Sequence, residues 1–164
     1  MKRVLVLGGA GFIGINMMQL LKKKKYKILC VDKLTYASNK KALLSNKFEN
    51  IRLDINNKNI YNVVKNFSPS FVINFAAETH VDRSIDTPKN FINTNIFGVF
   101  NVLEVLRKLK HLKIKYIHIS TDEVYGDIKK NKFSLESDKF NPTSPYASSK
   151  AASDLLVKSY IKTY

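Results

Sequence analysis

The stretch "RVLVLGGAGFIG" at residues 3–14 decides the fold, because an apolar run passes directly into four glycines. The apolar run at 3–7 predicts a buried strand, and the pattern after it predicts a helix over 12–23. Between them Gly9, Gly11 and Gly14 fit G-x-G-x-x-G, while Gly8, Gly11 and Gly14 fit G-x-x-G-x-x-G. Glycines there permit a tight turn and the approach of a pyrophosphate to the helix N-terminus.

An acid in the right place strengthens this interpretation. Asp32 ends the apolar run "KILCVD" at 27–32 and lies 18 residues beyond Gly14. That spacing is typical of a carboxylate that accepts hydrogen bonds from an adenosine ribose. The acid favours NAD over NADP because it would repel a 2′-phosphate, although Lys33 weakens the argument slightly. The alternative is a strand, turn and helix that bind nothing.

Apolar runs and amphipathic stretches alternate along the rest of the chain. Further strands are predicted at 50–55, 70–77 and 115–120, and further helices at 40–46, 57–67, 87–110 and from Pro145 to the end. The stretch 127–145 is predicted as a loop. This alternation predicts an α/β fold: a Rossmann-type, doubly wound parallel sheet of about five strands with helices on both faces. We expect one NAD-binding domain over residues 1–164.

Composition limits the other functions. The 164 residues carry a formal net charge of +15, but the lysines are scattered, with one run at 22–25 where a helix should end. A basic nucleic-acid-binding module is one alternative interpretation of this charge. Because the lysines do not form a dedicated patch, we expect no nucleic-acid partner. No apolar stretch approaches the roughly 20 residues of a membrane span, and the glycines interrupt any signal-peptide pattern. The single cysteine, Cys30, predicts a buried residue, no metal site and a cytoplasmic location.

A second pattern concerns proton transfer. "YASSK" places Tyr146 and Lys150 four residues apart, on one face of the last predicted helix. Because an adjacent ammonium and a positively charged nicotinamide favour the phenolate, we expect them to lower the pKa of Tyr146. Together with Ser120 and Thr121 after the strand at 115–120, these residues form a proton-relay set for oxidising an alcohol.

Two adjacent acids follow that strand in "STDEVYG" at 120–126. For an isolated Asp-Glu pair such as Asp122 and Glu123, the default interpretation is a solvated turn. The alternative is a pair of proton-transfer groups at the mouth of a site, and the rest of the sequence has to decide between the two.

Six stretches carry a resemblance to a known family. They are "GGAGFIG", "DKLTYASN", "AAETHVDRSID", "NTNIFG", "STDEVYGD" and "SPYASSKAASD", from Lys2 to about Asp154. In these stretches the chain resembles the N-terminal half of the dTDP-glucose 4,6-dehydratases, which are extended short-chain dehydrogenases/reductases. The resemblance implies NAD as cofactor, dTDP-glucose as substrate and dTDP-4-keto-6-deoxyglucose as product, in a hydro-lyase reaction. A UDP-glucose dehydratase or another related nucleotide-sugar dehydratase or epimerase is the neighbouring possibility.

The resemblance also implies roles for catalytic residues. Tyr146 would take the proton of the sugar 4-hydroxyl, with Thr121 hydrogen-bonded at that hydroxyl and Lys150 holding the nicotinamide ribose. Glu123 would remove the C5 proton, and Asp122 would protonate the departing 6-hydroxyl.

Binding residues follow from the same resemblance. Those implied to contact the cofactor are Gly8, Gly11, Phe12, Ile13, Gly14, Asp32, Lys33, Leu34, Thr35, Asp54, Ile55, Ala76, Ala77, Thr94, Tyr146 and Lys150. Those implied to contact the sugar are Thr79, His80 and Thr121. Taken alone, Asp54 is more often a turn residue and His80 a hydrogen-bonded loop residue.

The chain departs from the family in two respects. Leu7 stands where the family usually has threonine, and the sequence ends at Tyr164, whereas family members continue for about as long again. We therefore expect the substrate-binding half to be missing, the strand at 115–120 to be an exposed edge, and this portion to be weakly active or inactive alone. A truncated NAD-binding remnant without catalysis is the second alternative. The resemblance further implies a homodimer through the helices at 88–110 and 146–162.

Overall fold

The computed structural model describes residues 1–128 and 133–164, which form two compact units. Unit 1 comprises Met1–Ala76 and Asn101–Ile119, and unit 2 comprises Ala77–Phe100 and Ser120–Tyr164. Residues 129–132 of the predicted 127–145 loop lie outside the described residues, so that part of the prediction has no structural counterpart.

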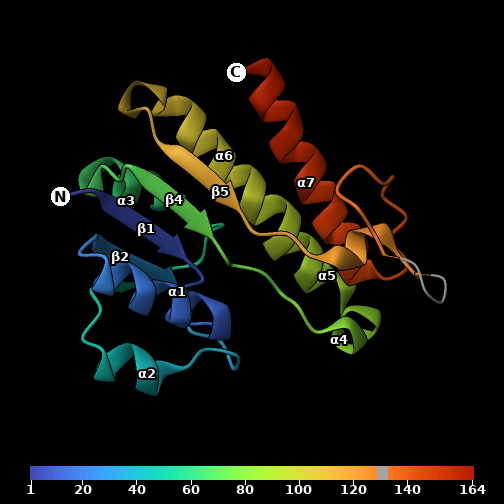
Figure 1. Cartoon of the computed structure of the whole chain (residues 1–164), viewed down its shortest axis with the longest axis horizontal. Coiled ribbons are helices and arrows are strands. Elements are labelled where there is room, and N and C mark those ends of the chain that lie inside the picture. The colour runs from blue at the N-terminus through green and yellow to red at the C-terminus, as the bar shows by residue number, and fades with distance from the viewer. Residues whose placement is uncertain (129–132) are drawn as a thin grey trace. The chain divides into compact units, whose positions relative to one another are not determined.

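Unit 1 is built on a parallel sheet (Figure 1). Its strands are β1 (Arg3–Leu7), β2 (Lys27–Asp32), β3 (Asn50–Arg52), β4 (Phe71–Asn74) and β5 (Lys115–His118). They lie in the order β3-β2-β1-β4-β5, so among the described residues β5 is an edge strand, as expected. Leu7 is in register with both Val31 and Asn74, which brings the carboxyl ends of three strands to one edge. The predicted Rossmann-type fold is confirmed.

Helices of unit 1 cover both faces of this sheet (Figure 1). Alternate residues of a strand point to opposite faces. Leu5 and Leu7 therefore pack in one core with α3 (Ile60–Phe67) and α6 (Val99–Lys108). Val4 and Val6 pack in the other with α1 (Phe12–Lys23) and α2 (Lys40–Ser45). Cys30 is a free, buried cysteine of this second core, as the sequence predicted.

Polar side chains end several elements earlier than the apolar pattern predicts. β3 stops at Arg52 rather than 55, and Oδ1 of Asp54 accepts a hydrogen bond from the backbone N of Asn56 (2.9 Å). β4 stops at Asn74 rather than 77, because its Oδ1 accepts one from the backbone N of Ala76 (3.1 Å). The predicted 57–67 helix begins only at 60, and β5 ends at 118 rather than 120. Short Asn and Asp side chains compete with regular backbone pairing in this way.

Unit 2 is mainly helical. It contains α4 (Val81–Asp86), α5 (Pro88–Phe91), the π-helix η1 (Ile92–Gly98), the 3-10 helix η3 (Asp122–Tyr125) and α7 (Pro145–Thr163). The predicted 87–110 helix is thus α5, η1 and α6 in succession, followed by the short 3-10 helix η2 (Lys110–Leu112). The sequence analysis missed α4 and the π-helix. Of the helices within 1–128 and 133–164, none combines the length and apolarity that crossing a membrane requires.

Candidate active site

The turn from β1 into α1 in unit 1 is built on glycines that leave no room for side chains. Gly8 has a φ of +72°, and a Cβ there would lie 2.4 Å from the backbone N of Ala76. A Cβ at Gly14 would lie 2.6 Å from the carbonyl oxygen of Gly8. Because these neighbours are backbone atoms, neither can move aside cheaply. Both positions require glycine for the fold itself.

Gly11 is different, because the packing of the chain does not require it to be glycine. A Cβ there would meet one neighbouring atom, the carbonyl oxygen of Gly8 at 3.4 Å, and its φ of −71° suits any residue. No side chain caps the helix that Gly11 begins, and Phe12 and Ile13 are 84% and 60% exposed. The first-turn N–H groups of α1 therefore meet an open surface, which is the arrangement that binds phosphate at a helix N-terminus.

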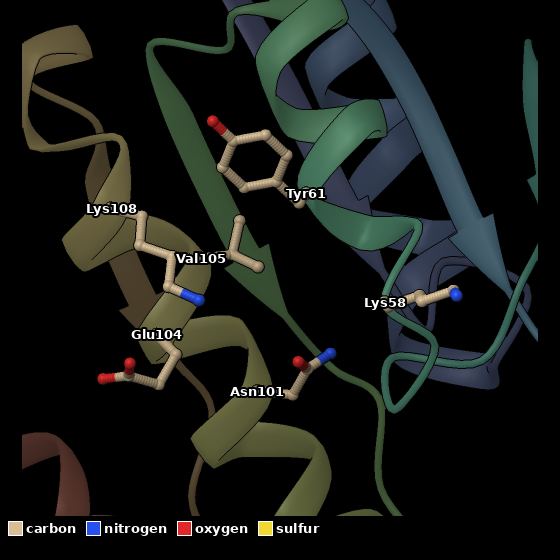
Figure 2. A pocket seen from close by; sticks show the side chains of 6 residues that line it. All are labelled: Lys58, Tyr61, Asn101, Glu104, Val105 and Lys108. Carbon is tan, nitrogen blue, oxygen red and sulfur yellow. The ribbon is translucent and has the colours of Figure 1, made fainter.

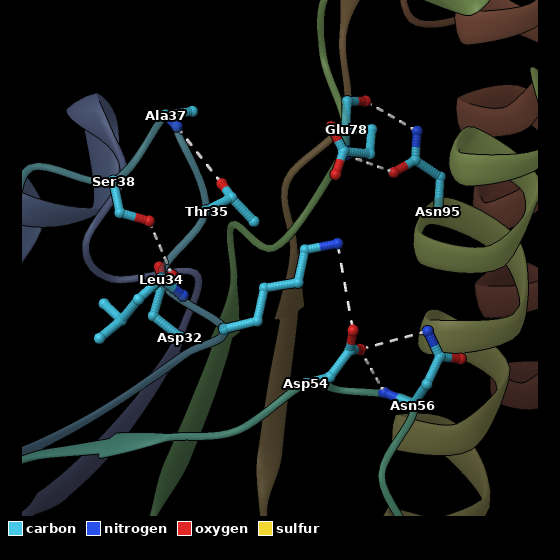
Figure 3. A network of polar contacts seen from close by, with 10 residues as sticks. Asp32, Leu34, Thr35, Ala37, Ser38, Asp54, Asn56, Glu78 and Asn95 are labelled. Atoms are coloured by element: carbon cyan, nitrogen blue, oxygen red, sulfur yellow. Dashed lines mark hydrogen bonds and ion pairs between the residues drawn. The ribbon is translucent and has the colours of Figure 1, made fainter. Parts of the chain in front are cut away.

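Asp32 fixes two loops at the carboxyl end of β2. Its Oδ2 accepts a hydrogen bond from the backbone N of Ala10 (3.0 Å) in the glycine loop. Its Oδ1 accepts from the backbone N of Leu34 (2.7 Å) and from Oγ of Ser38 (3.0 Å), as Figure 3 shows in part. A carboxylate can accept about four hydrogen bonds, so these three leave room for one more donor, such as a ribose hydroxyl.

The neighbouring residues of unit 1 are engaged in loop contacts. Nζ of Lys33 lies 4.0 Å from Oδ2 of Asp54, whose Oδ1 also accepts from the side chain of Asn56 (3.2 Å), as drawn in Figure 3. Asp54 thus has the turn role that the sequence analysis kept open. Oγ1 of Thr35 accepts from the backbone N of Ala37 (3.4 Å). The Ile55 side chain is buried in the core at 3% exposure, so only its backbone is available to a ligand.

In unit 2, a buried amide holds the segment that begins at Ala77. Oδ1 of Asn95 accepts from the backbone N of Glu78 (2.9 Å), and its Nδ2 donates to the carbonyl of Glu78 (2.9 Å), as Figure 3 shows. Nδ2 also donates to Oγ of Ser149 (2.8 Å), which in turn donates to the carbonyl of Tyr146 (2.7 Å). The sequence analysis missed Asn95, although "NTNIFG" contains it. The network ties the 77–80 segment, the π-helix η1 and α7 together.

The predicted residues around this amide differ in exposure. Thr94, next to it on η1, is buried at 5% exposure, whereas Thr79 and His80 are exposed. His80 precedes α4, and its carbonyl accepts from the backbone N of Ser84 (3.1 Å), so its backbone helps to begin that helix. Thr79 and His80 are therefore accessible from solvent, while Thr94 is part of the packing.

The two acids lie on a short 3-10 helix whose first turn is capped by Thr121. Oγ1 of Thr121 accepts from the backbone N of Glu123 (3.4 Å) and donates to Oδ1 of Asp122 (3.3 Å). Both acids are exposed, while Val124 after them is buried. Gly126 then turns the chain with a φ of +77°, at a point where a Cβ would overlap the carbonyl oxygen of Asn141. The acids thus occupy a fixed turn.

Tyr146 and Lys150 lie in the first two turns of α7. Oγ of Ser144 caps this helix by accepting from the backbone N of Ala147 (3.0 Å), and Pro145 occupies its first turn, as predicted. Tyr146 is 7% exposed and packs edge-on against Phe91, with ring centroids 6.2 Å apart. Lys150 is 5% exposed.

The electrostatics of the pair differ from expectation. Burial raises the pKa of Tyr146, a hydrogen bond with Thr121 lowers that pKa, and the charges of Glu123 and Asp122 raise it further. The net direction is upward, so the expectation that the pKa of Tyr146 is lowered is wrong for the protein's own groups. Burial lowers the pKa of Lys150, and the charge of Asp154 opposes that shift. The structure therefore favours a protonated Tyr146, and burial disfavours the ammonium of Lys150.

A pocket of about 450 Å³ lies elsewhere in unit 1 (Figure 2). It is lined by Lys58 and Tyr61 around the start of α3 and by Asn101, Glu104, Val105 and Lys108 of α6. Nδ2 of Asn101 donates to the carbonyl of Ile55 (2.6 Å), and Arg107 holds Glu104 through two 2.8 Å contacts. None of the predicted site residues lines this pocket. Across the part of the chain that the structure describes, no three His, Cys, Asp or Glu side chains gather as metal ligands would.

The fold and these residues define a class: a Rossmann-type α/β fold that joins a glycine-rich turn to the Tyr–Lys pair of short-chain dehydrogenases/reductases. The family model described as GDP-mannose 4,6 dehydratase matches residues 5–164. The chain belongs to this family.

Curated relatives agree with the resemblance drawn from the sequence. The chain is 39% identical to the dTDP-glucose 4,6-dehydratase of Neisseria meningitidis serogroup B, over 100% of this chain and 50% of the relative. It is 39% identical to the Salmonella typhimurium enzyme of the same name, over 99% of this chain and 51% of the relative. The chain thus spans about half the length of the curated relatives it matches.

Solved structures give the same picture. A dTDP-glucose 4,6-dehydratase from Bacillus anthracis in complex with NAD is 36% identical, with a TM-score of 0.86 over 100% of this chain and 52% of that chain. A UDP-glucose 4-epimerase from Thermus thermophilus in complex with NAD has a TM-score of 0.90, but only 27% identity, over 99% of this chain and 52% of that chain. Backbone similarity alone does not separate the two activities, whereas sequence identity is higher with the dehydratase.

The Asn95 network gives a stability prediction. Asn95→Ala removes three hydrogen bonds and leaves buried partners at Glu78 and Ser149 without them. We expect the free energy of unfolding to fall by about 2 to 4 kcal/mol, because unsatisfied buried polar groups are costly. Urea denaturation measures it. Asn90→Ala, at an exposed position of the adjoining helix α5, is the control and should stay within about 0.5 kcal/mol of wild type. Equal losses in the two variants would contradict the assignment.

Proposed function

We propose that this chain binds NAD and forms the cofactor-binding portion of a nucleotide-sugar 4,6-dehydratase. The observation that carries the proposal is the open surface at Gly11, where the chain's own packing leaves space beside uncapped N–H groups. Asp32 keeps one hydrogen-bonding position for a ribose hydroxyl, and its negative charge disfavours a 2′-phosphate. The residues present therefore fit NAD, and relatives solved with NAD have the same fold.

When bound, NAD supplies a hydride acceptor at the nicotinamide ring and returns the hydride later in the reaction. Tyr146 accepts the proton of the sugar 4-hydroxyl, while its hydrogen bond with Thr121 holds the phenol in place. Lys150 contributes a positive charge on the same face of α7. A positive charge near Tyr146 is needed, because burial and the two acids raise the pKa of its phenol.

The two adjacent acids, Asp122 and Glu123, perform the proton transfers of the dehydration step. Oxidation at C4 acidifies the C5 proton, which Glu123 removes as a base, and Asp122 in its protonated form gives a proton to the leaving 6-hydroxyl, which departs as water. Hydride supplied by bound NAD at C6 would be matched by return of the proton from Glu123 to C5, which completes the reduction. One base and one acid on neighbouring residues of one fixed turn suit an elimination within one sugar. This favours the proton-transfer interpretation of "STDEVYG" over a solvated turn.

We propose dTDP-glucose as substrate, because the two curated relatives described above are named as dTDP-glucose 4,6-dehydratases. The family model is described as GDP-mannose 4,6 dehydratase, so the match to it does not itself select the nucleotide base. A second candidate function is NAD binding without turnover, which burial favours because it raises the pKa of Tyr146 and lowers that of Lys150. The predicted cytoplasmic location belongs to the same proposal and agrees with a free, buried Cys30.

The substitution Gly11→Ala tests cofactor binding separately from folding. Because the added Cβ meets only the carbonyl oxygen of Gly8, at an ordinary contact distance of 3.4 Å, we expect the free energy of unfolding to stay within about 0.5 kcal/mol of wild type. NAD affinity, measured by isothermal titration calorimetry, should fall at least about tenfold, since the methyl group occupies the phosphate approach. Leu20→Ala, half-exposed farther along α1, is the control and should leave affinity unchanged. Unaltered NAD affinity in Gly11→Ala, or no binding by wild type, would refute the proposal.

Turnover is measured on the native protein from its source cells. Its length is first determined from its intact mass. Glu123→Gln should stop exchange of the C5 proton with solvent deuterium, with kcat lowered about 10²- to 10⁴-fold. Asp122→Asn should retain that exchange and slow the loss of water. Asp127→Asn, an exposed acid of the same loop, is the control. Exchange that persists in Glu123→Gln would exclude its role. Absence of turnover in a native chain of this length that binds NAD would select the second candidate function.

A homodimer is the remaining part of the proposal. Apolar side chains are exposed on the predicted dimer helices, with Phe97 at 57% and Leu155 at 57%. We expect a dimer by light scattering at micromolar concentration, and Phe97→Glu should shift it toward monomer because it buries a charge at the interface. Ile85→Glu is the matched control, since Ile85 is 65% exposed on α4, outside those helices. A wild-type monomer would contradict the prediction.

A further inference from the structure

One face of α7 carries a row of residues at four-residue spacing: Tyr146, Lys150, Asp154 and Lys158. Side chains four apart on a helix lie above one another, so Asp154 lies between two lysines. Within α7, Pro145–Thr163, Asp154 is the one acidic residue. The sequence analysis noted it only as the end of a matching stretch.

Asp154 is held from a second element. Oγ of Ser120 donates a hydrogen bond to Oδ2 of Asp154 over 2.5 Å, across 34 positions of sequence. Ser120 directly precedes Thr121, which is hydrogen-bonded with Tyr146. The segment that bears Thr121 and the two acids is therefore tied to α7 by the hydrogen bond between Ser120 and Asp154.

The carboxylate of Asp154 acts on Lys150, because its negative charge favours the ammonium form. Lys150 is 5% exposed, and burying an ammonium is costly unless an opposite charge lies near it. Burial lowers the pKa of Lys150, and Asp154 acts against that shift. Four elements pack against α7: η1, η3, α4 and α5. The other ionisable groups on these elements and on this face of α7 are Tyr146, Lys158, Asp122, Glu123, Tyr125, Asp82, Arg83, Asp86 and Lys89.

We propose that Asp154 is a positioning residue whose carboxylate, oriented by the Ser120 hydroxyl, keeps the ammonium of Lys150 charged and aligned on the face of α7 that bears Tyr146. This inference rests on the proposed function for its consequence in catalysis, but the contacts that carry it belong to the chain alone. Asp154 thus acts on Tyr146 indirectly, through the positive charge of Lys150, and does not contact the reacting groups itself.

Two substitutions separate the charge of Asp154 from its hydrogen bond. Asp154→Asn removes the charge, while the amide oxygen can still accept from Ser120. Ser120→Ala removes the hydrogen bond and keeps the charge. Lys150 is followed by NMR through its side-chain Cε resonance, identified by its loss in Lys150→Arg, while the pH of the 164-residue chain is varied from about 3 to 11.

We expect the Lys150 titration to move to lower pH in Asp154→Asn, beyond the uncertainty of the measurement, because removing the carboxylate leaves the burial effect unopposed. Ser120→Ala should move it less. In wild type, the same resonance should show a second, smaller inflection in the acid range, where Asp154 itself titrates. A folded Asp154→Asn with an unchanged Lys150 titration would overturn the proposal, as would an equal shift in Ser120→Ala. If Asp154→Asn does not fold, absence of the acid-range inflection in wild type overturns it.

NAD affinity provides the link to function. In Asp154→Asn, binding should weaken about tenfold between neutral pH and the pH at which Lys150 has lost its proton, since a hydrogen bond from a charged donor is lost. The wild-type chain should show this loss only at higher pH. Failure of wild type to bind NAD would refute the proposed function and leave the Lys150 result standing. If wild type binds NAD but the Lys150 titration does not move in Asp154→Asn, the role of Asp154 is refuted and the proposed function stands.

Discussion

Unit 1 depends on one steric constraint: where β1 turns into α1, backbone meets backbone with no space for a side chain. A Cβ at Gly8 or Gly14 would lie within 2.6 Å of backbone atoms. This contact lets β1, α1 and the end of β4 come close together, so the carboxyl edge of the sheet forms at a helix N-terminus. Asp32 then hydrogen-bonds to the same loop through Ala10. A tight fold and an open anion-binding surface are two results of one arrangement.

Unit 2 uses a polar constraint instead. Asn95 is 1% exposed on a π-helix, and its amide bonds to the backbone of Glu78 and to Ser149. π-Helical turns are rare and occur often at functional sites, because the extra residue reorients a side chain. Here the side chain is that of Asn95, which hydrogen-bonds both to the 77–80 segment and to α7. Asn95 therefore fixes the backbone at Glu78, directly before Thr79 and His80.

Sequence reasoning succeeded where the signal is local. The glycines, the acid 18 residues after Gly14 and the four-residue spacing of Tyr146 and Lys150 each lie within one or two elements. It failed where partners lie far apart in the chain: Asn95 and Ser149 are 54 positions apart, and Ser120 and Asp154 are 34 apart. It also extended β3 and β4 too far, because apolar letters continue past the Asp54 and Asn74 turns. Roles assigned to individual site residues stay predictions.

The direction of the Tyr146 shift has a consequence for how the proposed reaction would be controlled. Burial and the charges of Glu123 and Asp122 keep the phenol protonated. An enzyme of this design holds its base in the unreactive form until a positive charge approaches, and Lys150, itself disfavoured as an ammonium by burial, is only part of that charge. Proton removal from the sugar would then be coupled to cofactor binding, because NAD brings the remaining positive charge. In the proposed reaction the acids that raise the pKa of Tyr146 would also perform the later elimination, so the groups proposed for dehydration would make the alcohol oxidation depend on the cofactor.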